Sequence, residues 1–300
     1  MRFERLDLNL LVALDSLLET QSVTETASRL HLSQPSVSAA LARLRDYFAD
    51  DLLVLVGRKM LPTAKAEELA PAIKDMLNLV RFRIIHADDY DPAQSRRRFR
   101  IVASDYAFDV LMSKVLAKAE KLSPYATFDL SSPSLQKSRQ FIDGEIDVMV
   151  VIENYMTADH PSELLYTDED AVICWNAGIY ASGISTAQFL QARHVVAVFG
   201  QEQLPTVTEL HFDASGIDRH VAIRVPSFAA IPGAVIGTNR IATMHKRQAE
   251  LFSAIYPIQM HSLPIKGPGI REVMQWHKLR HNDAGLRWIL SLIRAEAEHL

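Results

Sequence analysis

The 300-residue sequence predicts an all-α N-terminal winged helix-turn-helix with a long linker helix, followed by a larger α/β region of two lobes. Three observations lead to this fold class. Apolar residues recur at helical spacing through the first 48 residues, an apolar seam runs along the next helix, and strands alternate with helices beyond residue 92. The expected domains are residues 1–62, 63–91 and 92–300.

Composition limits the kinds of protein that this chain can be. The net charge is −4, and the first 62 residues carry seven Lys and Arg against eight Asp and Glu, which excludes a protein coated in positive charge for indiscriminate binding to nucleic acid. DNA contacts would then need local cations, and the candidates are Arg29, Arg43, Arg45, Arg58 and Lys59.

No apolar run approaches the ~20 residues of a membrane span and no signal-peptide core follows Met1, so we expect a cytoplasmic protein without a membrane partner. Cys174 is the single cysteine, which excludes an intrachain disulfide and predicts a buried small apolar residue.

Three helices are predicted before residue 50, over residues 6–20, 22–32 and 33–48. Ser22 or Thr24 can cap the second helix, and Ser33 can cap the third, which has Pro35 in its first turn. The third helix has an apolar stripe of Val37, Ala40, Leu41, Leu44 and Phe48. Its other face carries small or polar residues: Gln34, Ser36, Ser38, Ala39, Ala42 and Arg43.

A short helix, the turn "HLS" and a second helix with a small polar face form the pattern of a helix-turn-helix. Small side chains let a helix approach the floor of the major groove, where Gln, Ser and Arg can reach base edges or phosphates. The alternative is a three-helix structural bundle. The stretch "LLVLVGRKMLPT" that follows favours the first interpretation, because it predicts a hairpin wing with a cationic tip at Gly57, Arg58 and Lys59.

A long helix is predicted after Thr63. Its apolar positions form a seam that is too narrow for a core helix and therefore predicts a dimer: Ala66, Leu69, Ala70, Ile73, Leu77, Val80 and Ile84. Pro71 should bend this helix or free a carbonyl near Glu67.

The segments "DLNLL", "SVTETASRLHLSQPSVSAALARLR" and "DDLLVLVGRKMLPT", in this order and before a long helix, resemble the N-terminal region of LysR-type transcriptional regulators. The likeness is to the branch with flavonoid-responsive nodulation activators and salicylate- and nitrotoluene-responsive regulators. It implies that the recognition helix and the wing contact DNA through Ser33, Gln34, Pro35, Ser36, Ser38, Arg43, Arg58 and Lys59. Ala39 departs from the many relatives that carry Arg at this position, which removes one expected contact.

The larger region begins after Pro92, where "DPAQSRRRFR" predicts a polar hinge. "FRIVAS", "ATFDLS" and "IDVMVVI" alternate with helices in the βαβαβ order of a parallel sheet. A second series runs through "AVICW", "HVVAVF", "HVAIRV", "IATMH" and "IQMHSL", so two α/β lobes with a cleft are expected. Ligands of such sheets bind at the carboxyl ends of the strands.

That geometric rule selects a set of candidate ligand-binding positions: Ser104, Ser131, Ser132, Ile152 to Asn154, the Phe199-Gly200-Gln201 loop, Ser227 and Phe228. Aromatic walls with a few hydroxyls and one amide suit a flat, weakly polar ligand. The alternative for each position is an ordinary capping Ser or core Phe. We select Ser104, Ser132, Ile152, Phe199, Gln201, Ser227 and Phe228 as the effector site.

The resemblance extends to this region through "VPSFAAIPGAVIGTNRIATMHKR" and "WHKLRHNDAGLRWI". It implies a two-lobed, periplasmic-binding-protein-like effector domain with the inducer in the cleft and Ser104 at a position where a hydroxyl contacts it. Asp168 and Glu169 fall near the position of a His in salicylate-type regulators. This difference favours a neutral phenol over an anionic benzoate.

Two other patterns could suggest a metal site or a catalytic site. "HADDYD" (His86, Asp88, Asp89 and Asp91) lacks the spacing of a calcium loop, and His277 beside Trp276 is expected to be a polar core residue near the lobe interface. No nucleophile elbow, zinc-protease or dinucleotide motif occurs, so neither an enzyme nor a cofactor is expected. The sequence predicts a ligand-responsive transcriptional activator that binds double-stranded promoter DNA and a small aromatic or phenolic inducer. The chain is also expected to form a dimer through the linker helix and a tetramer from two such dimers, and to contact RNA polymerase. The alternative function is that of a two-lobed binding protein or enzyme with an N-terminal dimerisation bundle.

Overall fold

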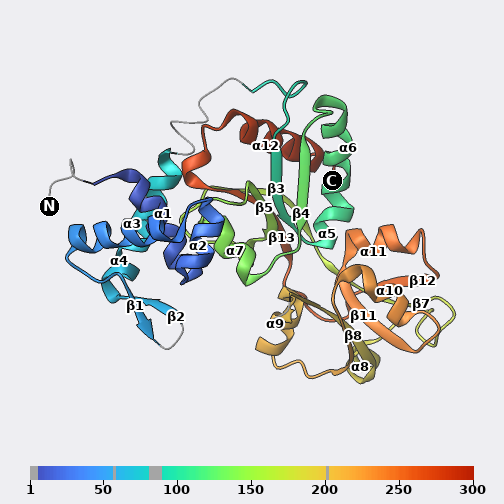
Figure 1. Cartoon of the computed structure of the whole chain (residues 1–300). Helices are drawn as coiled ribbons and strands as arrows, with labels where there is room; N and C mark the ends of the chain where they lie inside the picture. The colour runs from blue at the N-terminus through green and yellow to red at the C-terminus, as the bar shows by residue number, and fades with distance from the viewer. Residues whose placement is uncertain (1–5, 57–58, 81–89, 201–202) are drawn as a thin grey trace. The chain divides into compact units, whose positions relative to one another are not determined.

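The computed structural model describes residues 6–56, 59–80, 90–200 and 203–300. Contacts divide the chain into two compact units, Met1–Ala87 and Asp88–Leu300, which are described separately. Helices and strands of both units are labelled in Figure 1.

The first unit contains the three predicted helices and a hairpin. In chain order its elements are α1 (Leu8–Thr20), α2 (Val23–Leu30), α3 (Gln34–Phe48), β1 (Leu53–Val56), β2 (Lys59–Pro62) and α4 (Ala64–Leu79). The predicted N-caps are confirmed: the Ser22 side chain accepts a hydrogen bond from the backbone N–H of Glu25, and Ser33 does the same for Ser36. His31 ends α2 in the left-handed conformation, which turns the chain sharply toward α3.

The core of this unit lies between α1 and the apolar stripe of α3. Leu14 and Leu17 of α1 are fully buried together with Val37 and Leu44 of α3. Because these positions recur every three or four residues, one face of each helix is committed to packing and the other remains exposed.

The expectation for α4 is wrong in one respect. Its seam residues Ala66, Ile73 and Leu77 are buried in the same core as α1 and α3, so the seam has a partner within one chain. The apolar spacing therefore does not by itself indicate a dimer. The helix continues through Pro71 to Leu79, and the predicted remainder of the linker over residues 81–89, which includes Ile84, lies outside the described residues.

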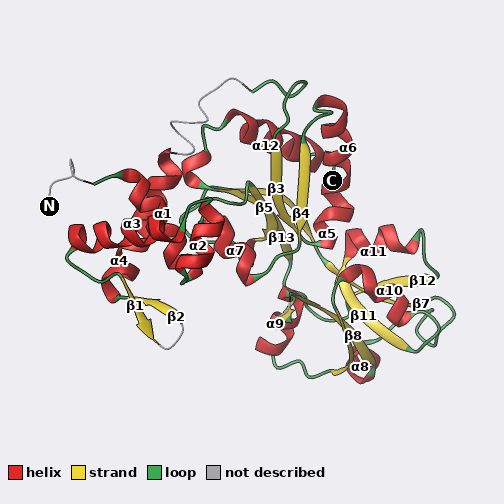
Figure 2. Ribbon diagram, in the orientation of Figure 1, coloured by secondary structure: helices red, strands yellow, loops and turns green. Residues whose placement is uncertain are grey.

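The second unit begins with a five-stranded sheet in the order β4-β3-β5-β13-β6. Strands β3 (Arg98–Ala103), β4 (Thr127–Ser131) and β5 (Val148–Ile152) are parallel, as predicted. Strands β6 (Ser162–Asp168) and β13 (Ile270–Trp276) complete the sheet in antiparallel pairing, so the sheet is mixed (Figure 2).

Helices cover both faces of this first sheet. On one face, Ile101, Val148 and Val150 pack with α6 (Ser113–Leu122) and α12 (Ala284–Ala297). On the other, Val102 and Met149 pack around Phe141 of α7 (Leu135–Ile142). The helix predicted after Ser104 is divided: α5 (Asp105–Ala107) leads into a π-helical turn (Phe108–Met112) before α6.

The second sheet has the order β10-β8-β11-β7-β12, with the short β9 (Leu204–Pro205) beside β8. Its strands are β7 (Asp170–Trp175), β8 (Arg193–Phe199), β10 (His220–Val225), β11 (Arg240–His245) and β12 (Ile258–Ser262). Strands β10, β8 and β11 are parallel, whereas β7 and β12 run antiparallel to their neighbours. The covering helices are α8 (Thr186–Gln191), α9 (Val207–Ala214), α10 (Ile231–Val235) and α11 (Lys246–Ser253).

The chain passes between the two lobes twice. Glu169 alone separates β6 of the first lobe from β7 of the second, and residues 263–269 return the chain from β12 to β13. The stretch from Gly267 to Gly269 is thus part of a crossover. His277 is buried, as expected for a polar core residue, but it follows the far end of β13 and not the crossover end.

Candidate DNA-binding surface and ligand cavity

The face of α3 opposite its apolar stripe is exposed. Val37, Leu41 and Leu44 are buried, whereas every residue predicted to contact DNA in this segment is exposed: Ser33, Gln34, Pro35, Ser36, Ser38 and Arg43. The hydroxyl oxygens of Ser33 and Ser36 are 2.7 Å apart, and the Ser33 hydroxyl accepts from the backbone N–H of Ser36, so the helix begins with a small polar turn that Ser33 caps. A helix of this shape fits the width of a DNA major groove.

The candidate cations around α3 have different environments. Arg43 has 61% of its side chain exposed and a 3.4 Å contact with Asp7, which leaves its guanidinium accessible. Arg45 instead donates to the carbonyl oxygens of Asp51 and Leu53 at 2.7 and 2.6 Å, and Arg29 pairs with Glu19. Arg45, a candidate cation that is not among the residues expected to contact DNA, therefore holds the start of the hairpin.

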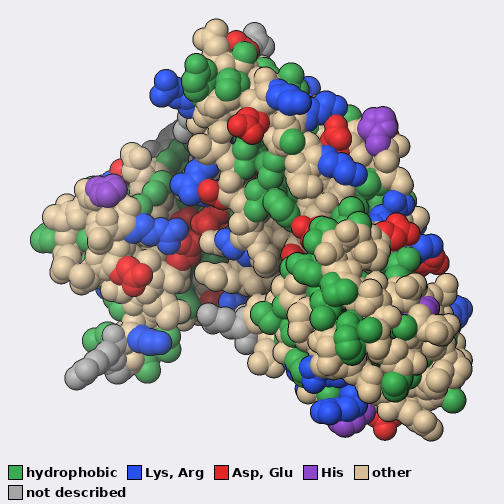
Figure 3. All heavy atoms as spheres, turned by 90° about the vertical axis from the view of Figure 1, so that its right-hand side faces the viewer, with side chains coloured by type: hydrophobic (Ala, Val, Ile, Leu, Met, Phe, Trp, Pro, Cys, Tyr) green, Lys and Arg blue, Asp and Glu red, His purple; other side chains and the backbone are tan. Residues whose placement is uncertain are grey.

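The predicted wing is present as the antiparallel pair β1 and β2. Lys59 is exposed at the start of β2, and Leu55 has 72% of its surface exposed. Gly57 and Arg58, the predicted tip, lie outside the described residues. On the face drawn in Figure 3, Lys and Arg side chains are interspersed with Asp and Glu, in keeping with the net charge of −4.

A cavity of about 230 Å³ lies between the two lobes of the second unit. It is located at the carboxyl ends of strands from both sheets, which is where ligands bind in open α/β folds. Ser104 follows β3, Ile152 ends β5, Phe199 ends β8 and His245 ends β11. Apolar side chains form most of the wall, with Met149, Val151, Leu204 and Val207 among them.

Four of the seven predicted effector residues line this cavity: Ser104, Ile152, Phe199 and Phe228. Ser132 and Ser227 are not in its wall, although their neighbours Pro133 and Phe228 are. Ser131 lines a separate surface groove, and Gln201 lies outside the described residues. The rule that ligands bind at the carboxyl ends of strands thus located the cavity. In two loops, however, it selected the residue next to the one that lines the wall.

Sequence reasoning missed several polar residues of the wall: Ser134, Ser138, Tyr155, Thr206 and His245. The same rule could have found His245, because this residue ends the predicted strand "IATMH". Ser134 and Thr206 are N-caps of α7 and α9, where they accept hydrogen bonds from the backbone N–H groups of Lys137 and Glu209. A Ser or Thr immediately before a helical segment is a detectable N-cap.

Hydrogen bonds between the lobes lie beside the cavity. The Tyr155 hydroxyl donates to the carbonyl oxygen of Pro205 at 2.9 Å, and the backbone N–H of Ala229 donates to Asp105 at 2.7 Å. Burial raises the pKa of both the Tyr155 hydroxyl and the Asp105 carboxyl. Ser104 lines the cavity and also caps α5, because its Oγ accepts from the N–H of Ala107 at 3.1 Å.

The inference drawn from Asp168 and Glu169 requires correction. Neither residue is among the described residues that line the cavity. Asp168 accepts hydrogen bonds from the Tyr106 hydroxyl at 2.9 Å and from the backbone N–H of Arg247, while Glu169 pairs with Lys246 at the surface. Their charge therefore gives no argument about the charge of a ligand.

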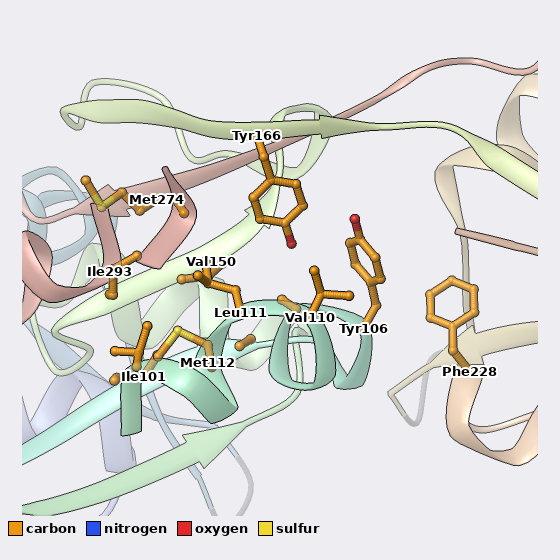
Figure 4. Close-up of a cluster of buried hydrophobic side chains, with 14 of the residues drawn as sticks. Ile101, Tyr106, Val110, Leu111, Met112, Val150, Tyr166, Phe228, Met274 and Ile293 are labelled. Carbon is orange, nitrogen blue, oxygen red and sulfur yellow. The ribbon is translucent and has the colours of Figure 1, made fainter. Parts of the chain in front are cut away.

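A buried carboxyl lies near this crossover. Glu272 of β13 is 1% exposed, and neither of its carboxyl oxygens has a hydrogen-bond partner in the described structure. Burial and the charge of Asp168 raise the pKa of Glu272 to about 8. Its neighbour in the sheet is Tyr166, and Figure 4 shows the hydroxyl groups of Tyr106 and Tyr166 pointing toward one another.

Other candidate chemistry is not supported by the geometry. Cys174 is buried, as predicted, and burial raises the pKa of its thiol. Among the described residues, no three His, Cys, Asp or Glu side chains are grouped as metal ligands; His86, Asp88 and Asp89 lie outside them. Of the helices that the structure describes, none combines the length and apolar character needed to cross a bilayer.

Two family models match the chain. Residues 8–67 match the bacterial regulatory helix-turn-helix protein, lysR family, and residues 92–298 match the LysR substrate binding domain. Among curated proteins, nodulation protein D of Azorhizobium caulinodans is 38% identical over 301 residues, covering 100% of this chain and 96% of its own length. Nodulation protein D 1 of Rhizobium meliloti is 35% identical, with 100% and 98% covered.

Solved structures share the fold. A full-length OxyR variant from Pseudomonas aeruginosa aligns with a TM-score of 0.71 at 14% identity, covering 96% of this chain and 95% of that one. A probable transcriptional regulator from the same organism gives 0.64 at 24% identity, with 98% of each chain covered. CbnR in complex with its target DNA gives 0.52 at 14% identity, covering 97% of this chain and all of the other.

Proposed function

This chain belongs to the LysR family of transcriptional regulators, and on that premise we propose that it activates a promoter in response to a small aromatic or phenolic inducer bound between its lobes. The observation that carries the proposal is the cavity itself. The cavity lies between the two lobes, is lined mainly by apolar and aromatic side chains, and contains a few hydroxyl groups and one imidazole. Such a wall suits a flat ligand with few polar groups better than a sugar or a phosphate.

On the DNA side, α3 is proposed as the recognition helix. Gln34, Ser36 and Ser38 present short hydrogen-bonding groups on its exposed face, and Arg43 adds an accessible cation. Lys59, with Arg58, would contact the phosphate backbone from the wing. CbnR, which has the same fold, has been solved in complex with its target DNA.

The coupling between the two sites is proposed to act through assembly. Two copies joined through the linker helix would present two recognition helices to two half-sites, and contacts between effector domains would join two dimers into a tetramer that bends promoter DNA. An inducer would favour the arrangement to which it binds more tightly, and this arrangement would engage RNA polymerase.

Two measurements test the proposal. A gel-shift titration with DNA from upstream of the chain's own gene, against a scrambled duplex of equal length, should show preferential binding. A thermal-shift screen of the full chain against phenols, benzoates and flavonoids should show stabilisation by aromatic compounds, because a ligand that binds only the folded state raises its stability. Equal retention of both duplexes, or stabilisation by sugars and phosphates alone, would overturn it.

A further inference from the structure

Glu272, the third residue of β13, is a buried acid close to a point where the chain crosses between the lobes. Strand β13 begins directly after residues 263–269, which return the chain from the second lobe. Glu272 is 1% exposed, and both of its carboxyl oxygens are buried without a hydrogen-bond partner among the described residues. A buried carboxyl group without a donor or a cation is more stable when it carries a proton.

The neighbours of Glu272 in the first lobe do not stabilise a negative charge. Tyr166 of β6 and the apolar Ile152 of β5 lie opposite Glu272 in the register of the sheet. The Tyr106 hydroxyl of α5 points toward that of Tyr166 (Figure 4). The Asp168 carboxylate, at the end of β6, repels a charge on Glu272.

The second lobe places a cation and an imidazole beside these tyrosines. The guanidinium carbon of Arg247, on α11, lies 5.7 Å from the centre of the Tyr166 ring. This guanidinium donates to main-chain carbonyl oxygens of Leu300 and of β6, at 2.7 and 3.4 Å, and it forms no ion pair with Glu272 in the described structure. The His245 ring packs 4.4 Å from that of Tyr106, centroid to centroid.

The carboxylate that repels Glu272 also joins the two lobes. Oδ2 of Asp168 accepts a hydrogen bond from the Tyr106 hydroxyl of the first lobe at 2.9 Å. The same oxygen accepts from the backbone N–H of Arg247, at the start of α11 in the second lobe, at 3.2 Å. A negative charge at the N-terminus of a helix is favourable, so Asp168 stabilises this contact. Glu169, the next residue, adds a main-chain bond from the N–H of Lys246 at 2.8 Å.

We propose that the proton on Glu272 holds the two lobes in the arrangement described here, and that its loss loosens the contact between them. With Glu272 neutral, Asp168 is the only charged carboxylate of the pair and retains its donors from both lobes. With Glu272 ionised, two carboxylates repel one another in a buried site whose packed cation, Arg247, is bound elsewhere. Separation of α11 from Asp168 admits water and relieves this repulsion. The hinge is therefore sensitive to pH without any ligand, which goes beyond the proposed function.

The direction of the pH dependence follows from proton binding. Burial and the charge of Asp168 raise the pKa of Glu272 to about 8 in the arrangement described here. Once the lobes loosen and water reaches the carboxyl group, its pKa returns toward the ordinary value of 4.5. The looser arrangement therefore gains population as the pH rises toward 8 and gains no more from this group above it. Burial raises the pKa of Tyr106 and Tyr166 further above 10, so neither tyrosine ionises in this range.

Distances between spin labels on the two lobes test the proposal. Helices α7 and α9 contribute to opposite walls of the cavity, and Gln136 of α7 and Leu210 of α9 are both exposed. We would label the full chain carrying Gln136→Cys and Leu210→Cys, and dilute it with unlabelled chain so that only distances within one copy are measured. Cys174 is buried and does not compete for the label. Double electron–electron resonance between pH 6 and pH 9.5, with no compound added, should show longer or broader distances as the pH rises toward 8.

Two variants of the labelled chain assign the change to this pair of carboxyls. Glu272→Gln keeps the shape of the side chain and cannot ionise, so its distances at pH 9.5 should equal those at pH 6. Asp168→Asn keeps an oxygen that can accept from Tyr106 and Arg247 but removes the repelling charge, so its distances should change less than those of the parent. Glu120→Gln, at an exposed carboxyl of α6, is the control and should change as the parent does.

The outcomes decide the role of Glu272 independently of the proposed inducer. Equal distances at pH 6 and pH 9.5 in the labelled parent would overturn the hinge and leave Glu272 as a buried group that affects only stability. A change of equal size in Glu272→Gln would also overturn it, because another group would then be titrating. A change in the parent and in Glu120→Gln that is absent from Glu272→Gln supports the proposal.

Discussion

Replacing the buried carboxyl of Glu272 should stabilise the second unit at alkaline pH. The folded state raises the pKa of Glu272 from 4.5 to about 8, because burial and Asp168 disfavour its charged form. Each unit of pKa difference between the folded and unfolded states corresponds to about 1.36 kcal/mol, so ionising this group in place costs on the order of 5 kcal/mol. Glu272→Gln keeps the shape of the side chain and removes the charge.

The sign of the effect follows from proton binding. Because the folded state holds this proton more tightly than the unfolded state, the associated stability is fully present below about pH 4.5 and is lost as the pH rises through about 8. The free energy of unfolding of the wild-type unit should therefore fall by roughly 2 kcal/mol between pH 6 and pH 8 from this group alone. The Glu272→Gln variant should lack that decline.

Tryptophan fluorescence provides a specific assay. All three tryptophans, Trp175, Trp276 and Trp288, lie in the second unit, so denaturant titrations monitored by their emission report its unfolding. Glu120→Gln, which alters an exposed carboxyl of α6, is the matched control and should follow the wild-type pH profile. Parallel profiles for wild type and Glu272→Gln between pH 6 and pH 8 would refute the assignment of a neutral buried carboxyl.

Four further predictions concern DNA binding, the cavity and the core. Gln34→Ala should weaken binding to the specific promoter site by about 1–3 kcal/mol, and equal losses on scrambled DNA in anisotropy titrations would contradict a base contact. Lys59→Ala should weaken binding to all duplexes and reduce the slope of log K against log salt by about one, whereas an unchanged slope would place the wing away from the phosphates. Ser104→Ala should shift the midpoint of the inducer response by the roughly 0.5–1.5 kcal/mol of one hydrogen bond. If instead only the melting temperature falls, Ser104 is a helix cap alone. Leu44→Ala, at a fully buried position of the first core, should cost about 2–5 kcal/mol of unfolding free energy, and circular dichroism melting that matches wild type would contradict the core assignment.

Local rules were sufficient where a feature depends on neighbouring residues. The caps at Ser22 and Ser33 and the buried stripe through Val37 and Leu44 follow from spacing within one helix, and all four appear as expected. The cavity could be located because the carboxyl ends of parallel strands converge whatever their side chains are.

Features that depend on a partner distant in sequence could not be predicted. The seam of α4 has the same spacing whether Ile73 faces a second copy or the core of its own unit, and only the packed structure distinguishes these cases. Arg45 resembles a DNA-contacting cation until the carbonyls of Asp51 and Leu53 are seen to bind it. The pairing of His245 with Asp170 joins residues 75 positions apart, which no local motif reveals.

The central claim, that an aromatic compound in this cavity controls the promoter, is tested most directly by filling the cavity. Ser138 of α7 is half-buried and lines it, whereas Gln136 on the same helix is exposed and does not, so Ser138→Trp and Gln136→Trp form a matched pair. The measurement is the inducer dose–response of a promoter reporter, with gel-shift affinity for the promoter measured without inducer. The account predicts unchanged DNA affinity in both variants, a normal response for Gln136→Trp and no response for Ser138→Trp. An unshifted midpoint and full amplitude in Ser138→Trp would contradict it.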